Sequence, residues 1–199
     1  MDREREFNGK RKGKTTIELS EIEELDLKKC FKNWKENNYS IHIFDIDGCI
    51  TTSFFPNIEK IVDIQETKLI LSSAKLFFFF KIYFSSIPKD NLTKVYFLTG
   101  RKTEYYREET INLLSELGVK EDQIIFYPNN YTYSRLRYFT FKTYNCLRII
   151  LKDKKKSKVY IYDDLPDYFP KLRKILKNQE YFNVSYYEIR DQIDWSYIS

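Results

Sequence analysis

Short apolar runs alternate with amphipathic stretches along most of the chain. The runs that predict strands are YSIHIFDID (39–47), KVYFLTG (94–100), QIIFYP (123–128), KVYIYDD (158–164) and FNVSYYEI (182–189). Apolar residues at helical spacing predict the helices between them, over residues 65–84, 103–117, 140–151 and 167–178. This order predicts an α/β fold, a doubly wound, Rossmann-like parallel sheet with crossover helices on both faces.

The N-terminal part differs from the rest of the chain in composition. Residues 1–16 are polar and basic, which is typical of a flexible tail. From residue 17 to 34, apolar residues recur at nearly helical spacing and predict a lead-in helix packed on the sheet. We therefore expect a basic tail over residues 1–16 and a single domain over residues 17–199.

Composition narrows the class of protein. A chain of 199 residues and 24.3 kDa fits one domain, and its 42% of hydrophobic residues can supply a core. The net charge of +5 permits an anionic substrate without requiring one. Cys30, Cys49 and Cys146 show no metal-ligand spacing, and their odd number favours a reducing, cytoplasmic location.

The sequence does not predict a membrane protein. The N-terminus MDREREFNGKRKGK is charged and lacks the apolar core of a signal peptide. The most apolar stretch, residues 69–84, is interrupted by Lys75 and Lys81 and is shorter than the roughly 18 apolar residues of a membrane span. We interpret it as a buried core segment.

Chemically reactive residues follow three of the predicted strands. They are Asp45 and Asp47 after the first strand, Thr99, Gly100 and Arg101 after the second, and Asp163 and Asp164 after a later one. Ligands of open α/β sheets bind at the carboxyl ends of the strands, beside the point where the strand order reverses. We therefore expect these residues to form one site.

The acidic residues among them indicate a metal ion. Carboxylates gathered at buried strand ends repel one another unless a cation neutralises them. Mg²⁺ prefers a few carboxylate oxygens, retained waters and a phosphate oxygen. Asp45, Asp163 and Asp164 are the expected side-chain ligands, together with the main-chain carbonyl of Asp47. Asp167 is the alternative second acid after the later strand.

The spacing of Asp45 and Asp47 suits phosphoryl transfer. Asp45 can attack phosphorus as a nucleophile, while Asp47 protonates the leaving oxygen and afterwards activates water. Gly48 lets the backbone turn close to the substrate. Taken alone, the Asp-Gly pair is equally typical of an ordinary turn.

Donors for the phosphate oxygens follow further along the chain. Thr99 offers a hydroxyl and a backbone N–H, and Lys142 offers a positive charge near a predicted helix start, with Lys152 as the nearest competitor. Gly100 and Arg101 are expected substrate contacts. Arg101 can bind a phosphate through two N–H groups, and a structural ion pair is the equal alternative for it.

Four of these segments, taken in order, resemble the haloacid dehalogenase (HAD) superfamily. FDIDGCIT (44–51) is similar to motif I, FLTGR (97–101) to motif II, TFKT (140–143) to motif III and VYIYDD (159–164) to motif IV. Within the superfamily, TGRKTEYYREETINLL (99–114), TFKT and IYDDLPDYF (161–169) resemble the phosphatase domains of polynucleotide kinase-phosphatases and a related RNA-repair-like group.

The resemblance implies a magnesium-dependent phosphomonoesterase. The roles it implies are Asp45 as nucleophile, Asp47 as acid and base, Thr99 and Lys142 on the phosphate, and Asp163 with Asp164 on the metal. Cys49 and Ile50 stand where Thr and Leu are more usual, and neither change removes a catalytic group. The gaps 52–92 and 127–139 are too short for a large cap domain, so we expect a minimal cap and an open site.

An open site suits a polymer end, so RNA or DNA ends and nucleotides are the expected substrates. The segment YPNNYTYSRLRYFTFKTY (127–144) interleaves aromatic and basic residues, which suits stacking on a single strand or, equally, filling the core edge. The alternatives are a protein phosphatase of the same fold and a catalytically silent RNA-binding module. His42 is expected to be a core residue, and Cys49 lacks the neighbours of a nucleophile.

Overall fold

The computed structural model describes residues 36–52, 63–153, 156–181 and 183–198. These residues form one parallel sheet with the strand order β3-β2-β1-β4-β5. The strands are β1 (Glu36–Phe44), β2 (Thr93–Lys102), β3 (Ile124–Tyr127), β4 (Lys156–Asp163) and β5 (Val184–Glu188). The first of these strands, β1, lies in the middle of the sheet, and the later strands are added on each side of it, which confirms the predicted doubly wound fold.

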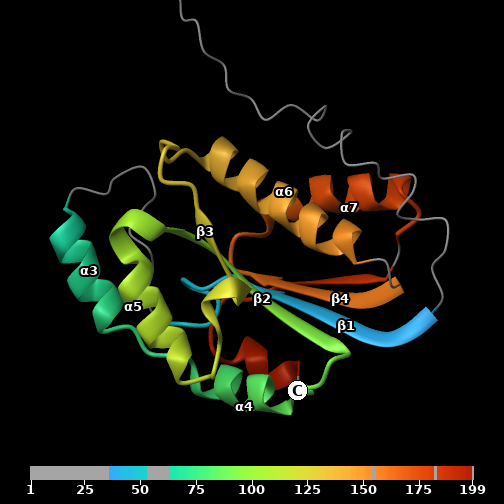
Figure 1. Ribbon diagram of the computed structural model, residues 1–199, viewed down its shortest axis with the longest axis horizontal. Coiled ribbons are helices and arrows are strands. Elements are labelled where there is room, and N and C mark those ends of the chain that lie inside the picture. Colours follow the sequence, from blue (N-terminus) through green and yellow to red (C-terminus); the bar gives the residue numbers. More distant parts are fainter. Residues whose placement is uncertain (1–35, 53–62, 154–155, 182, 199) are drawn as a thin grey trace, which may run out of the picture.

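Helices cover both faces of the sheet (Figure 1). On one face lie α6 (Arg135–Lys152) and α7 (Phe169–Asn178). On the other lie α3 (Ile64–Ser72), α4 (Phe78–Ser86) and α5 (Thr103–Ser115). Short 3-10 turns occur at Glu121–Gln123 (η1), Pro166–Tyr168 (η2) and Asp194–Tyr197 (η3), and η3 packs against α4.

The two faces of the sheet bury separate hydrophobic clusters. Ile41 and Ile43 of β1 contribute to the cluster beneath α6 and α7. Phe44 points the opposite way and joins Phe80, Phe97 and other residues beneath α4 and α5. Successive side chains of a strand point to opposite faces. Since both faces are covered, the strands read as continuous apolar runs in the sequence.

The single helix predicted over residues 65–84 is wrong, because the structure has two helices there, α3 and α4. Between them the chain is extended and bonds to the segment that follows β1: the Phe77 amide donates to the Ile50 carbonyl, and the Thr52 amide to the Lys75 carbonyl. These long-range hydrogen bonds interrupt the helical pattern. The stretch is also not wholly buried, since Leu69 is 74% exposed.

Other predicted boundaries shift as well. Helix α6 begins at Arg135, five residues before the predicted start at residue 140, because the Ser134 side chain accepts a hydrogen bond from the Arg137 amide and caps the helix. The gap 127–139 is therefore partly helical. The predicted tail (1–16) and lead-in helix (17–34) lie outside the described residues. None of the helices in the described ranges is long and apolar enough to cross a membrane.

Trp195 anchors the C-terminal turn η3 to the sheet. Its side chain is fully buried, and its indole N–H donates to the Cys49 carbonyl at 2.8 Å. Replacing Trp195 by Ala should lower the free energy of unfolding by about 3–5 kcal/mol, because it leaves a large cavity and an unpaired carbonyl. Urea denaturation measures the change. Tyr197→Ala, in the same turn but 81% exposed, should stay within about 0.5 kcal/mol of the parent protein; equal losses for the two variants would contradict this role.

Candidate active site

The predicted acidic residues meet at the carboxyl ends of β1 and β4. Asp45 directly follows β1, Asp163 ends β4 and Asp164 follows it. The Asp45 amide donates to the Tyr162 carbonyl at 2.9 Å, which holds the two strand ends together. One carboxylate oxygen from each of the three residues lies within 4.8 Å of the others. The sheet therefore assembles three carboxylates from separate parts of the chain in one place.

Lys142 of α6 lies among these carboxylates. Its Nζ atom is 2.6 Å from Asp45 Oδ1 and 3.0 Å from Asp163 Oδ2, and it donates to the Leu98 carbonyl at 2.7 Å. The side chain is fully buried, so three acceptors match the three protons of the ammonium. Burial by itself lowers the pKa of Lys142, but Asp163 and Asp45 outweigh it and raise this pKa well above its usual range. Lys142 is therefore held as a cation. The competing candidate, Lys152, lies ten residues further on at the end of α6, where it is exposed.

The two neighbouring aspartates differ in their contacts. Both Asp163 oxygens have donors: Oδ2 accepts from Lys142 and from the Tyr168 hydroxyl at 2.9 Å, and Oδ1 accepts from the Leu165 amide at 2.9 Å. Asp164 Oδ1 is buried and has no hydrogen-bond donor among the described residues. A buried carboxylate oxygen without a donor is a natural place for a cation. Asp163 thus positions Lys142, while Asp164 has an oxygen free for a metal.

The alternative acid, Asp167, lies outside this cluster. Its Oδ2 accepts from Arg135 Nη2 at 2.6 Å, and both side chains are largely exposed. An exposed ion pair of this kind contributes little free energy. Of the two acids that the sequence left open, Asp164 is the one that the fold brings to Asp45.

The carboxylates are electrostatically strained without a cation. Burial raises the pKa of Asp45 well above its usual range; Lys142 opposes this rise and Asp163 adds to it. Burial, followed by the charge of Asp163, raises the pKa of Asp164 to about 6. Three carboxylates face a single ammonium group, and all their free donor atoms are oxygens. This donor set fits Mg²⁺, and the role of Asp45, Asp163 and Asp164 as its side-chain ligands stays a prediction.

The Asp47 carboxylate is turned to Arg101. Arg101 Nε donates to Asp47 Oδ2 at 2.9 Å and Nη2 to Oδ1 at 2.6 Å, and Nη1 donates to the Thr110 hydroxyl of α5 at 3.2 Å. Arg101 is completely buried. Of the two interpretations of Arg101, the structure contains the ion pair, and a substrate contact stays a prediction. The pair leaves only the main-chain carbonyl of Asp47 as its expected metal ligand.

The two remaining predicted residues, Thr99 and Gly100, lie within β2. This strand extends to Lys102, two residues past its predicted end at residue 100. Thr99 is fully buried, and its hydroxyl oxygen accepts from the Arg101 amide at 3.1 Å, so its own proton remains available to a ligand. Gly100 contacts a ring, since a Cβ atom there would lie 2.9 Å from Tyr138 Cε2. The Gly100 carbonyl accepts from the Tyr133 hydroxyl at 2.7 Å.

Two tyrosines at the site were not found from the sequence. Tyr168 bonds to Asp163, and Tyr138 lies with its ring centroid 5.2 Å from Lys142 Nζ. The chain has 17 tyrosines, so residue type alone gives no signal. The four-residue spacing from Tyr138 to Lys142, which places both on one side of a helix, is the only local clue.

The aromatic and basic segment 127–144 mostly fills the core. Tyr127, Tyr138 and Phe141 are buried in the cluster beneath α6. Arg137 is exposed near the start of this helix. The expected core role of His42 agrees with its 7% exposure. Burial and the charge of Asp45 raise the pKa of the Cys49 thiol well above its usual range, which disfavours the thiolate that a nucleophile needs.

The chain was compared with known proteins. No family model matches it, and no curated protein matches it. Among solved structures it is similar to the HAD domain of the effector protein Lem4 from Legionella pneumophila, with 16% identity, a TM-score of 0.51, and coverage of 81% of this chain and 93% of that one. It is also similar to the Legionella pneumophila effector Ceg4, with 14% identity, a TM-score of 0.51, and coverage of 83% and 93%.

These likenesses support a HAD-like fold. At such low identity they show the fold alone, so the finer resemblance to polynucleotide kinase-phosphatases stays a prediction. Residues 53–62, which follow the motif I segment, lie outside the described residues. The expected open entrance therefore also stays a prediction.

Gly48 provides a test of how tightly the site is built. Its φ is +74°, and a Cβ atom there would lie 2.6 Å from Asp164 Oδ2. Gly118 has a similar φ of +69° but nothing within 4 Å of its Cβ position. Gly118→Ala should therefore lower the free energy of unfolding by about 1–2 kcal/mol, which is the cost of placing a Cβ atom in the left-handed backbone conformation. Gly48→Ala should lose about 1–3 kcal/mol more, because it displaces Asp164. Equal losses in urea denaturation would show that Asp164 does not pack against Gly48.

Proposed function

We propose that this protein is a magnesium-dependent phosphomonoesterase that works through an aspartyl-phosphate on Asp45. The observation that supports this most directly is the ion pair between Asp45, at the end of β1, and Lys142. Asp45 is held by Lys142 at 2.6 Å, and the same cluster contains the unpartnered Asp164 oxygen. A nucleophilic carboxylate beside a site for a cation is the arrangement that phosphoryl transfer requires.

In the first step, an Asp45 carboxylate oxygen attacks the phosphorus of the substrate. The new bond joins Asp45 to phosphorus, and the bond from phosphorus to the ester oxygen breaks. The leaving alkoxide takes a proton from the Asp47 carboxyl group and departs as an alcohol. The Thr99 hydroxyl proton, which no described contact uses, donates to a phosphoryl oxygen as negative charge is redistributed.

In the second step, water hydrolyses the aspartyl-phosphate. Asp47, now ionised, takes a proton from the water as the water oxygen attacks phosphorus. The bond between phosphorus and the Asp45 oxygen breaks, inorganic phosphate leaves, and the Asp45 carboxylate is restored. The proton on Asp47 is then available for the next substrate, so the cycle balances without another reactant.

Arg101 supports this use of Asp47. Its two hydrogen bonds occupy one lone pair on each Asp47 oxygen. A carboxylate oxygen has two lone pairs and can accept more than one hydrogen bond. Because Arg101 is buried and also bonds to Thr110, it fixes the direction of the Asp47 carboxylate. We assign Arg101 a positioning role in the proposed reaction.

Mg²⁺ would be held by Asp45, Asp164 and the main-chain carbonyl of Asp47. When bound, it would neutralise carboxylate charge and polarise a phosphate oxygen. Lys142 supplies a fixed positive charge beside Asp45 and keeps this carboxylate oriented toward the substrate. Asp163 holds Lys142 in place through a hydrogen bond, and the Tyr168 hydroxyl in turn holds Asp163.

For the substrate we propose a phosphorylated nucleic acid end or a nucleotide. The support is the net charge of +5, the resemblance in residues 99–114, and the exposed Arg135 and Arg137 at the start of α6. Arg135 and Arg137 precede Lys142 by two turns or fewer on the same helix, and both are exposed. Exposed arginines in this position favour a polyanion over a neutral phosphoester.

Replacing Asp45 by Asn tests the nucleophile. The change removes the attacking negative charge with little change in shape, so phosphate release should fall by at least about a thousandfold. The assay measures release from p-nitrophenyl phosphate and from a 3′-phosphorylated oligonucleotide, each with and without Mg²⁺. Asp167→Asn, which alters an acid outside the cluster, should keep nearly full activity. An Asp45→Asn protein that retains activity would exclude the proposed mechanism.

Magnesium should stabilise the fold more at neutral than at acidic pH. The pKa of Asp164 is about 6 in the folded protein and about 4 for an ordinary aspartate. The folded state therefore binds this proton more tightly, and without a divalent ion stability declines as pH rises from about 4 through about 6. Mg²⁺ offsets that loss by binding the ionised carboxylates.

Thermal unfolding with and without 10 mM MgCl₂ measures this linkage. The rise in Tm on adding magnesium should be near zero at pH 4.5 and at least about 2–4 °C at pH 7.5, equivalent to roughly 1 kcal/mol for a domain of this size. Asp164→Asn should abolish the difference between the two pH values. An equal rise at both pH values would show that magnesium binds somewhere other than these carboxylates.

A further inference from the structure

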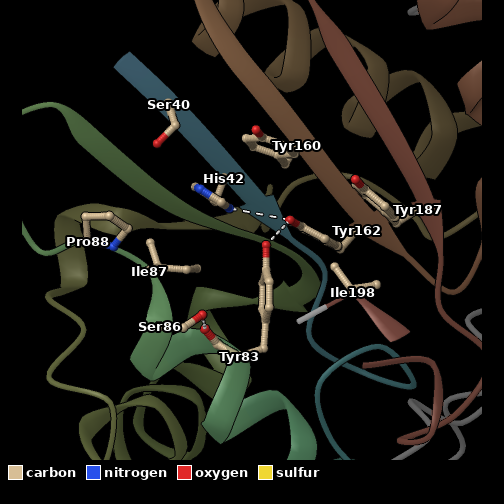
Figure 2. A pocket seen from close by; sticks show the side chains of 10 residues that line it. All are labelled: Ser40, His42, Tyr83, Ser86, Ile87, Pro88, Tyr160, Tyr162, Tyr187 and Ile198. Atoms are coloured by element: carbon tan, nitrogen blue, oxygen red, sulfur yellow. Dashed lines mark hydrogen bonds between the residues drawn. The ribbon is translucent and has the colours of Figure 1, made fainter. Parts of the chain in front are cut away.

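A second cavity lies on the α4 face of the sheet, away from the candidate active site. It has a volume of about 330 Å³ and lies between β1, β4 and β5 on one side and the end of α4 on the other (Figure 2). We call it the aromatic pocket, after His42, Tyr83, Tyr160, Tyr162 and Tyr187 in its wall. Among the described residues, none that lines it belongs to the acidic site, and none is charged.

The rings on the sheet stack on one another in register. His42 faces Tyr160 with ring centroids 4.8 Å apart, and Tyr162 faces Tyr187 at 5.0 Å. Each pair joins neighbouring strands at the same register position. Because the faces cover one another, the rings direct their edges and polar atoms away from the sheet. A cation binds over a ring face, so this arrangement does not suit a cationic ligand.

Polar atoms of the pocket remain available for a ligand. The Tyr83 and Tyr162 hydroxyls share a hydrogen bond, and the Tyr162 hydroxyl lies 3.5 Å from His42 Nδ1 (Figure 2). His42 Nε2 is on the other side of the imidazole ring and has no hydrogen-bond partner among the described residues. The same holds, within the described part of the chain, for the hydroxyls of Tyr160 and Tyr187.

These polar groups are uncharged near neutral pH. Burial lowers the pKa of His42 to about 4, and burial also raises the pKa values of Tyr83 and Tyr162. A neutral imidazole nitrogen is either a donor or an acceptor, and a phenol can be both. The pocket therefore offers neutral donors and acceptors along aromatic edges, and the Ile87 side chain contributes an apolar wall.

We propose that the aromatic pocket binds a small, uncharged nitrogen heteroaromatic ring, of the size of a purine. Its volume is at the lower end of the roughly 300–1,000 Å³ of ligand pockets. Ring nitrogens and exocyclic amines complement the His42 Nε2 atom and the free tyrosine hydroxyls. A phosphate or carboxylate finds no positive side chain in the lining, so an anion is disfavoured. The proposal is independent of the phosphatase chemistry.

Tyr160 lies between His42 and a short side chain of the next strand. Tyr160 pairs with Ser185 of β5, a small and exposed residue on the same face of the sheet. Within the described residues, Tyr160 stacks only on His42. Because His42 covers one face of the Tyr160 ring, the ring edge and the hydroxyl group are the parts of Tyr160 that a ligand in the pocket would contact.

The chain has one histidine, which makes the test direct. Long-range ¹H–¹⁵N correlation of the imidazole gives a single set of signals from His42, which can be followed while adenosine is added. We expect a saturable shift with a dissociation constant below about 1 mM. The shift should persist in Asp45→Asn, because it arises away from the acidic site. Adenosine monophosphate should bind more weakly than adenosine, since its phosphate has no cation to meet.

Two matched tyrosine variants complete the experiment. Tyr160→Leu keeps apolar bulk but removes the ring and hydroxyl, and should weaken adenosine binding at least about fivefold. Tyr96→Leu makes the same change on the opposite face of the sheet and should leave binding unchanged. Both variants should be checked for folding by their Tm. The absence of a saturable shift up to about 10 mM adenosine, equal binding by both variants, or tighter binding of the monophosphate would each overturn the proposal.

Discussion

The bond between the Lys142 ammonium and the carboxylates of Asp45 and Asp163 is the interaction on which the site depends. All three groups are buried, so any one of them alone would be costly in free energy. Lys142 also bonds to Leu98 of β2, and therefore joins α6 to the three central strands. The same contacts that neutralise the charges thus set the position of the helix on the sheet.

Arg101 is a second buried cation, and it joins a helix to the sheet on the opposite face. Arg101 joins Asp47, after β1, to Thr110 of α5. The segment from Asp45 to Asp47 is therefore held from both faces of the sheet, by Lys142 of α6 from one face and through Arg101 by Thr110 of α5 from the other. This division explains why the two aspartates of the DxD segment point to different partners. Asp45 stays beside Asp163, Asp164 and Lys142, while the Asp47 carboxylate is turned to Arg101.

The two faces of the sheet also differ in kind. The face under α6 and α7 is closed by aliphatic and aromatic packing and carries Lys142. On the other face, α4 is nine residues long, and beyond its end the sheet presents a row of stacked rings. Where the helix ends, polar atoms of His42 and the tyrosines remain accessible. One sheet therefore supports a charged site at its carboxyl edge and a neutral, aromatic pocket on its face.

The sequence by itself determined the fold class, the order of the strands along the chain and the reactive residues that lie at or near their carboxyl ends. Apolar runs and reactive residues directly after them are local features, so Asp45, Thr99 and Asp163 could be placed without coordinates. Only the tertiary structure decided that Arg101 pairs with Asp47, that Asp164 rather than Asp167 has the free oxygen, and that the helix over residues 65–84 is interrupted. The physical reason is that these outcomes depend on which side chains face each other across the sheet: Arg101 and Asp47 are 54 residues apart in the chain, and strand register and packing bring them together.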